Sequence, residues 1–194
     1  MPPWNRRRSS KPSTSGPDAQ PVAATTQGCP GCKAYEDFDR SKDPESYNCA
    51  GLALRTYGYP DLGELKAELA SRGARTMTDC AAKCGACEVK LWLWEFDVHL
   101  EDADGNVLLT RTGEFHTVAG PCDQNGEDPT RVLSKDGKRP VEGLIGPDFA
   151  PPVKHQAKSN EENPVLAEDS QGRPIYIVYT NVRETCYCFP CPSP

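Results

Sequence analysis

The sequence predicts an α+β domain in which helices come first and an antiparallel sheet follows. Apolar residues recur at helical spacing before residue 73, and from Glu88 onward they alternate with a period of two. Segregation of this kind along a chain is typical of α+β domains rather than of alternating α/β folds. The hydrophobic content of 37%, with 19 prolines and 16 glycines, indicates many loops around a thin core.

Three segments are expected along the 194 residues. Residues 1–27, rich in Pro, Ser, Thr and Gln, predict a disordered or extended N-terminal arm. Residues 28–185 predict the folded domain, which is long enough for one hydrophobic core. Residues 186–194 predict a Cys- and Pro-rich C-terminal tail.

Two helices are expected at the start of the domain. Asn48 is a good N-cap for the first, whose apolar residues continue at helical spacing to residue 57, before Gly58 stops it. Asp61 caps the second helix, and Glu64 three residues later completes a capping box.

An antiparallel meander is expected after these helices. Residues 88–100 alternate as one long strand with Trp92 and Trp94 on the same face, and residues 104–106 predict the hairpin turn that follows. Further strands are expected at 107–112, 114–119, 131–135, 138–141 and 175–179, with a loop-rich stretch at 147–164.

The charge pattern argues against nucleic acid as the main partner. The chain has a net charge of −6, and residues 1–17 hold basic residues and no acidic one, so the remainder is more acidic than the whole. We expect the basic arm to be solvated. The sequence has no run of 18 apolar residues, so we expect no membrane span.

The N-terminus bears on the cellular compartment. It has the positive charge of a secretory signal peptide but lacks the apolar segment, because residues 9–20 are polar and proline-rich. We therefore expect either a cytoplasmic protein or one exported by a route other than general secretion.

The chain contains 10 cysteines, most of them in clusters. Spacings of two intervening residues suit zinc, because neighbouring thiolates can then point at one ion. Disulfides are an equally weighted alternative, since they would cross-link the same segments in an oxidising compartment. The cysteines open to either role are Cys29, Cys32, Cys80, Cys84, Cys87, Cys122, Cys186, Cys188 and Cys191.

Cross-links of either kind would stabilise a domain with a thin core. The pair Cys29 and Cys32 could join Cys188 and Cys191 and so tie the two ends of the domain together. If Cys49 is a reactive thiol, nine cysteines remain, and at least one more must stay outside any disulfide or an uneven metal site must form.

Cys49 stands apart from the clusters in a setting that suits catalysis. It lies at the expected start of the first helix, where unpaired backbone N–H groups favour a thiolate. His116 lies within an expected strand, and a histidine beside the thiol would complete a nucleophile–base pair. The structural alternatives are a disulfide-bonded, inert buried or metal-ligating Cys49 and a merely packed strand histidine.

The run from Tyr47 to Leu52, Tyr-Asn-Cys-Ala-Gly-Leu, resembles the catalytic motif of the papain-like superfamily, in particular that of NlpC-type cell-wall peptidases. Their motif typically reads Tyr-Asp-Cys-Ser-Gly-Leu at the start of a helix. Their histidine lies on a strand of the following meander, where His116 is expected. The resemblance covers roughly residues 45–145.

The resemblance implies a papain-like, NlpC-like fold and a cysteine peptidase or amidase that needs no cofactor for catalysis. Cys49 would be the nucleophile and His116 would take its proton. The Cys49 backbone N–H, together with Tyr47 or Asn48, would hold the oxyanion and the substrate. The implied substrates are peptides of bacterial peptidoglycan, as for a delivered toxin or a wall-remodelling factor.

The sequence leaves open the third polar residue, which orients the histidine in this family. In the family it falls about a dozen residues beyond the histidine on the next strand, whereas residues 120–126 lengthen that connection here. Asp123, Ser134 and Asp136 are the candidates, and Lys135 carries the wrong charge for this role.

The unassigned third residue and the even cysteine count support a second hypothesis. In it, the chain is a catalytically inactive, cysteine-stapled papain-like module that binds a protein partner or serves structural assembly.

Overall fold

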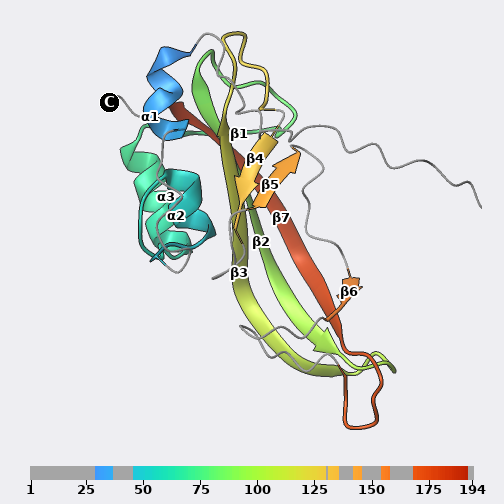
Figure 1. The fold of residues 1–194 in the computed structure, drawn as a ribbon. Coiled ribbons are helices and arrows are strands. Elements are labelled where there is room, and N and C mark those ends of the chain that lie inside the picture. Colours follow the sequence, from blue (N-terminus) through green and yellow to red (C-terminus); the bar gives the residue numbers. More distant parts are fainter. Residues whose placement is uncertain are drawn as a thin grey trace, which may run out of the picture.

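Short helices pack against an antiparallel sheet, which confirms the predicted α+β class (Figure 1). The predicted arm at residues 1–27 lies outside the described part of the chain. The computed structural model describes residues 29–36, 46–129, 131–135, 142–145, 154–157 and 168–191.

The helical elements are η1 (Pro30–Cys32), α1 (Lys33–Glu36), α2 (Cys49–Leu54) and α3 (Leu62–Ser71). The strands are β1 (Arg75–Met77), β2 (Glu88–Glu101), β3 (Val107–Pro121), β4 (Arg131–Ser134), β5 (Glu142–Ile145), β6 (Lys154–Gln156) and β7 (Tyr176–Pro190).

The helix boundaries follow from local capping. The predicted capping box of α3 is confirmed, because Asp61 accepts from the Glu64 backbone N–H at 2.8 Å and donates its own N–H to the Glu64 carboxylate at 2.9 Å. Asn48 caps α2 by accepting from Gly51 N–H at 2.9 Å. The helix is shorter than predicted, since Arg55 takes the left-handed conformation with φ of 56° and ends it.

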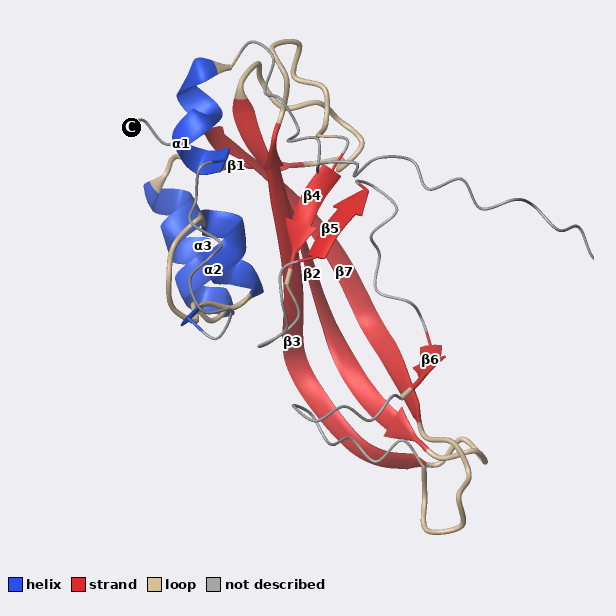
Figure 2. Cartoon of the chain, in the orientation of Figure 1, coloured by secondary structure: helices blue, strands red, loops and turns tan. Residues whose placement is uncertain are grey.

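The sheet is not the simple meander that the sequence predicts. Its strand order is β1-β7-β2-β3-β4-β5, with β6 paired to β7, so the last strand of the chain inserts beside β2. The strands β2, β3 and β7 run together and extend well beyond the helices (Figure 2). In this order β7 pairs with β2 from Tyr176 to Pro190 on one side and with β1 on the other, so β1 lies at the edge of the sheet.

Two predicted boundaries along this sheet are wrong. The segment from residue 186 is not a tail, because residues 186–190 form the end of β7 and Cys186, Cys188 and Phe189 are buried between β1 and β2. The strands predicted at 107–112 and 114–119 are one strand, β3. The predicted strand at 138–141 lies outside the described residues.

The strand pairing is irregular beside Asp97 of β2, both toward β3 and toward β7. This irregularity allows β3 to continue as one strand through Gly113. Gly113 has φ of 72°, which favours glycine, and its N–H donates to Asp97 Oδ1 at 3.1 Å. On the other flank Asn181, with φ of 53°, donates its side-chain amide to Asp97 Oδ2 at 2.7 Å. One carboxylate therefore holds the register of three strands where both neighbours are irregular.

Alternation along the strands separates two apolar clusters. The helix-side cluster contains Leu91 and Leu93 of β2 with Ala53 and Leu54 of α2. The far-side cluster contains Trp92, Trp94, Val118 and Val132. This division confirms the predicted alternation of β2 and shows that both faces of its first half are buried.

The cysteines form disulfides, one of the two alternatives that the spacings left open. Cys32 with Cys191 ties the two ends of the domain as predicted, whereas Cys29 bonds to Cys87 and not to the C-terminal pair. The four disulfides are Cys29–Cys87, Cys32–Cys191, Cys80–Cys186 and Cys84–Cys188.

Two groups of possible metal ligands coincide with disulfides. Cys80 and Cys186 lie near Glu184, and Cys84 and Cys188 lie near Glu88, but the sulfurs of each pair are bonded to one another. Because a metal ligand must be a thiolate, zinc would bind these groups only in a reduced protein.

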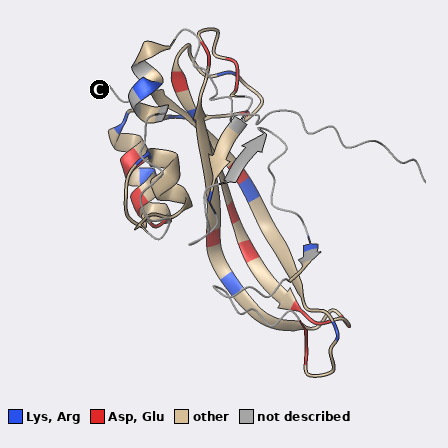
Figure 3. Cartoon of the chain, in the orientation of Figure 1, with Lys and Arg blue, Asp and Glu red and all other residues tan. Residues whose placement is uncertain are grey.

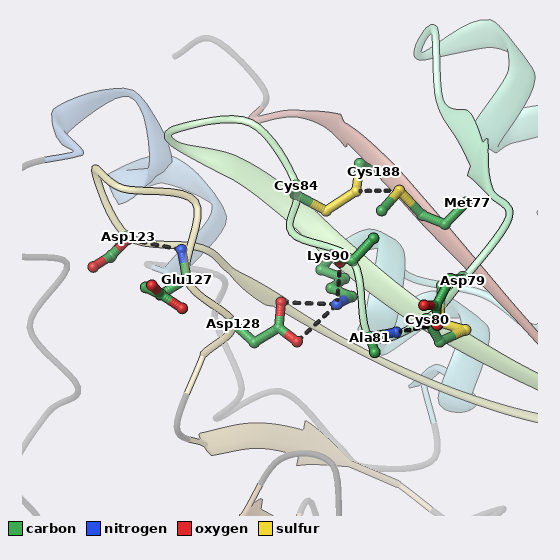
Figure 4. A network of polar contacts seen from close by, with 12 residues as sticks. Met77, Asp79, Cys80, Ala81, Cys84, Lys90, Asp123, Glu127, Asp128 and Cys188 are labelled. Carbon is green, nitrogen blue, oxygen red and sulfur yellow. Dashed lines mark hydrogen bonds and ion pairs between the residues drawn. A yellow bond between two sulfur atoms is a disulfide. The ribbon is translucent and has the colours of Figure 1, made fainter.

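A buried ion pair accompanies the disulfides at this end of the sheet. The Lys90 side chain is fully buried, and its ammonium donates to both Asp128 carboxylate oxygens at 2.7 and 2.8 Å and to the Ala82 carbonyl at 2.9 Å (Figure 4). These bonds hold the cysteine-bearing loop and the loop after β3 against β2.

The described surface has mixed charge. Basic and acidic residues both occur on α3, β3 and β7, whereas the charged residues of β2 are mostly acidic (Figure 3). Within the described residues, no helix combines the length and apolarity that crossing a membrane requires.

Candidate active site

Cys49 and Cys122 are the two cysteines that remain thiols once the four disulfides form. Cys49 is the first residue of α2 and is 9% exposed. A free Cys49 leaves nine cysteines, which cannot all pair, and Cys122 is the second cysteine that stays outside the disulfides.

The two thiols differ in their surroundings. Cys122 is fully buried beside the Cys84–Cys188 disulfide. Burial raises the pKa of its thiol to about 12, and the nearby Asp128 carboxylate adds to this effect. A thiol of this kind stays protonated at neutral pH and is inert.

The motif around Cys49 folds as a tight loop onto α2. A Cβ on Gly51 would lie 2.8 Å from the Gly58 carbonyl oxygen, so only glycine allows the chain to return so closely. The Asn48 side-chain amide donates to the Pro60 carbonyl at 3.1 Å while its oxygen caps α2. Asn48 therefore fixes this loop with both ends of its amide.

Tyr47 lies in the same loop, and its side chain is fully buried. Its ring centroid is 6.2 Å from that of Tyr57 and 5.3 Å from the Lys135 ammonium nitrogen. The second contact joins the loop before α2 to the residue that follows β4.

His116 is held between two neighbouring strands. Its ring is stacked on Trp94, its cross-strand partner in β2, with centroids 6.5 Å apart and an interplanar angle of 22°. Its Nε2 lies 3.1 Å from Ser134 Oγ in β4. These two contacts restrain both the position and the rotation of the imidazole.

The three candidates for an orienting residue have different outcomes. Ser134 is buried and hydrogen-bonded to His116. Asp123 instead closes its own loop, since it accepts from the backbone N–H groups of Asn125 at 2.7 Å and Glu127 at 2.9 Å, and these bonds lower its pKa. Asp136 lies outside the described residues.

The sheet register sets how the two proposed reactive groups can meet. Alternation along β3 places Phe115 in the helix-side cluster and His116 on the opposite face beside Trp94. The helix α2 contacts both β3 and β4, the strands that carry His116 and Ser134. A contact between Cys49 and His116 would therefore form around the edge of β3 next to β4, not across one sheet face.

A shallow groove lies at the other end of α2. It has a volume of about 470 Å³ and is lined by Leu54, residues 56–60, Glu64 and Glu68. Its lining includes the exposed rings of Tyr57 and Tyr59 but neither Cys49 nor His116.

Sequence reasoning missed the roles of Trp94 and Lys135. Trp94 could have been found, because a hairpin with its turn at 104–106 brings the first half of β2 beside the segment that holds His116. Lys135 left no sequence signal, since lysine is almost never fully buried.

Comparison of the chain with protein-family models, with curated proteins and with solved structures finds no match.

Proposed function

We propose that this chain is a papain-like cysteine peptidase or amidase, with Cys49 as nucleophile, His116 as base and Ser134 as the residue that orients the base. Peptidoglycan peptides are the substrate class to test, because the motif at Tyr47–Leu52 resembles that of NlpC-type enzymes.

The observation that carries the proposal is the hydrogen bond between His116 Nε2 and Ser134 Oγ. It engages one imidazole nitrogen from the next strand, the position that the family's third residue occupies. The other nitrogen, Nδ1, is then the one that would take the thiol proton. The stacked Trp94 ring shields this hydrogen bond on one side.

Two further observations support the proposal. Eight of the ten cysteines are locked in disulfides, and Cys49 keeps its thiol at the start of α2. The helix α2 also packs against the two strands that hold His116 and Ser134.

In this mechanism the Cys49 thiol gives its proton to His116 Nδ1, and the thiolate attacks the amide carbonyl carbon. The Cys49 backbone N–H stabilises the oxyanion of the tetrahedral intermediate. When the intermediate collapses, the imidazolium returns the proton to the leaving amine and a thioester remains on Cys49. Water, deprotonated by His116, hydrolyses the thioester and regenerates the thiol.

The decisive experiment measures hydrolysis of muropeptides by the disulfide-intact protein and by Cys49→Ala. We expect turnover by the first and none by the second. Cys122→Ala is the matched control, because it removes the other thiol without touching the site. Equal turnover in Cys49→Ala would refute the proposal.

A second candidate function is the inactive, disulfide-stapled module with a protein partner. The sheet register favours it, because α2 and His116 belong to opposite sheet faces. The two functions differ in the pH dependence of Cys49 alkylation by iodoacetamide. A coupled pair keeps Cys49 reactive below pH 7, and His116→Ala abolishes that reactivity. An identical profile in His116→Ala would support the inactive module.

A further inference from the structure

The groove lined by Leu54, residues 56–60, Glu64 and Glu68, here called the tyrosine groove, has an ordered wall. Gly58 donates its N–H to the Ser46 carbonyl at 2.8 Å, and its own carbonyl accepts from the Asn48 N–H at 3.2 Å. The Asn48 side-chain amide also donates to the Pro60 carbonyl at 3.1 Å. These bonds fix residues 56–60 in advance, so a ligand would not have to order them on binding.

Two side chains of the tyrosine groove are available to a ligand. The Tyr59 ring is 54% exposed and makes no hydrogen bond or ring contact with the described residues. The exposed Glu64 accepts from the Asp61 N–H through Oε2 at 2.9 Å, and its Oε1 has no partner in the described part of the chain. An exposed tyrosine ring and an exposed carboxylate in one groove suit a cationic ligand that also offers flat or apolar groups.

The charge of the other carboxylate in the groove is already compensated. Arg72 donates from Nε to Glu68 Oε1 at 2.8 Å and from Nη1 to the Leu54 carbonyl at 2.9 Å. Glu68 and Arg72 therefore offset each other, which leaves Glu64 as the uncompensated charge among the residues that line the groove. The tyrosine groove is thus complementary to positive charge.

The N-terminal part of the sequence has the chemistry that this groove selects. Residues 2–12 read Pro-Pro-Trp-Asn-Arg-Arg-Arg-Ser-Ser-Lys-Pro and contain no acidic residue. Proline-rich segments bind grooves that are lined by aromatic rings, because their extended conformation costs little entropy to fix. The guanidinium group of arginine also stacks on a tyrosine face and pairs with a carboxylate.

This segment can reach the tyrosine groove from the point where the described chain begins. Tyr35 donates its hydroxyl to the carbonyl of Ala53 at 2.6 Å, next to Leu54 in the lining of the groove. Cys29 is six residues before Tyr35, so their Cα atoms are at most about 23 Å apart. Residues 13–28 can span up to about 50 Å, which is more than this connection needs.

We propose that the tyrosine groove binds residues 2–12 of the same chain, with an arginine against Tyr59 and Glu64. The tether raises the effective concentration of the segment at the groove to the millimolar range, so a contact of modest affinity is sufficient. The inference goes beyond the proposed function, because it involves neither Cys49 nor His116. It also replaces the expectation, based on charge alone, that the basic arm is solvated.

The test is the binding of a fluorescein-labelled synthetic peptide with the sequence of residues 2–12, measured by fluorescence anisotropy. The peptide is titrated with the full wild-type chain and with a neutral-arm chain, which carries Arg6→Ser, Arg7→Ser and Arg8→Ser. We expect the neutral-arm chain to bind the peptide about tenfold more tightly, because the wild-type arm competes for the groove at a millimolar effective concentration.

Substitutions in the groove of the neutral-arm chain locate the contact. Tyr59→Ser should weaken peptide binding about fivefold, as the loss of one stacked cation implies. Glu64→Gln should weaken it about two- to fivefold and leave the start of α3 intact, because glutamine can also complete a capping box. Glu184→Gln is the matched control, since it removes an exposed carboxylate on β7 and should leave peptide binding unchanged.

Equal binding of the peptide by the wild-type and neutral-arm chains would overturn the inference, since it would show that the arm does not occupy the groove. Failure of the neutral-arm chain to bind the peptide would overturn it as well. Unchanged binding in Tyr59→Ser and Glu64→Gln would place the peptide at another surface, against the inference. None of these outcomes depends on muropeptide turnover, so the proposed function is tested separately.

Discussion

Ser134 Oγ lies 3.1 Å from Nε2 of His116 across two strands, although 18 residues separate them in the chain. The contact requires β4 to return beside β3, which it does where Leu133 pairs with Ala119. Ser134 thereby joins the face that holds Trp94 and Val132. The stability and the proposed chemistry of this contact can be measured separately.

Removal of the Ser134 hydroxyl should weaken the orientation of His116. We expect Ser134→Ala to lower kcat/KM for muropeptide hydrolysis about 3- to 10-fold, as the loss of one hydrogen bond of roughly 1 kcal/mol implies. Ser134→Thr, which keeps a hydroxyl, should recover part of the loss. Ser71→Ala is the control, because that hydroxyl bonds only within the exposed end of α3. Unchanged kinetics in Ser134→Ala would exclude an orienting role.

Cys122 should make the stability of the protein fall at alkaline pH. Its pKa is raised to about 12 in the folded state, against about 9 for an ordinary thiol. Between these pH values the unfolded state loses a thiol proton that the folded state keeps. The contribution of Cys122 to the free energy of unfolding is therefore fully present below pH 9 and is lost as the pH rises toward 12.

The slope expected from this one group is about 1.4 kcal/mol per pH unit above pH 9. Urea unfolding at pH 8, 9, 10 and 10.5 should show a steeper loss for the wild type than for Cys122→Ala. Parallel curves for the two proteins would contradict the raised pKa.

The ion pair of Lys90 and Asp128 should be asymmetric in its effect on stability. Lys90 is fully buried whereas the Asp128 side chain is 31% exposed, so Asp128→Ala strands an ammonium and should cost about 3 kcal/mol. Lys90→Met replaces the ammonium with an apolar group and should cost less. Chemical denaturation of both variants measures the difference.

The exposed pair of Lys83 and Glu127 provides the comparison for this prediction. Both side chains are more than half exposed, so Lys83→Met should leave the free energy of unfolding nearly unchanged. A cost for Asp128→Ala as small as that for Lys83→Met would show that the ammonium of Lys90 finds other compensation.

The disulfide Cys32–Cys191 should contribute most to stability by restraining the chain ends. It closes the longest loop, with a sequence separation of 159, so the double variant Cys32→Ser/Cys191→Ser should lose about 2–5 kcal/mol. Cys29→Ser/Cys87→Ser, which opens a separation of 58, should lose less. Thermal unfolding of the two double variants tests the order, and a reversed order would indicate that the entropy of the unfolded chain does not dominate.

Local signals in the sequence were sufficient for the elements themselves. The capping box of α3, the Asn48 cap of α2, the alternation of β2 and the turn after Glu101 depend on residues only a few positions apart. Such interactions form within one element or one turn, so propensity and periodicity predict them.

Strand order and cysteine pairing could not be predicted in the same way. The run around Cys186 and Cys188 contains proline and cysteine, which suggested a tail, whereas pairing with β1 and β2 makes it a strand. Spacing equally allowed zinc or disulfides, because each depends on which distant segments meet.

The sequence by itself therefore determined the α+β class, the helix that begins at Cys49 and the strand that carries His116. The tertiary structure alone decided that β7 lies beside β2, that Cys49 is outside the disulfides, and that Ser134 and Lys135 meet His116 and Tyr47. The physical reason is range: caps and alternation act between near neighbours, whereas these contacts join segments that come together only when the sheet forms.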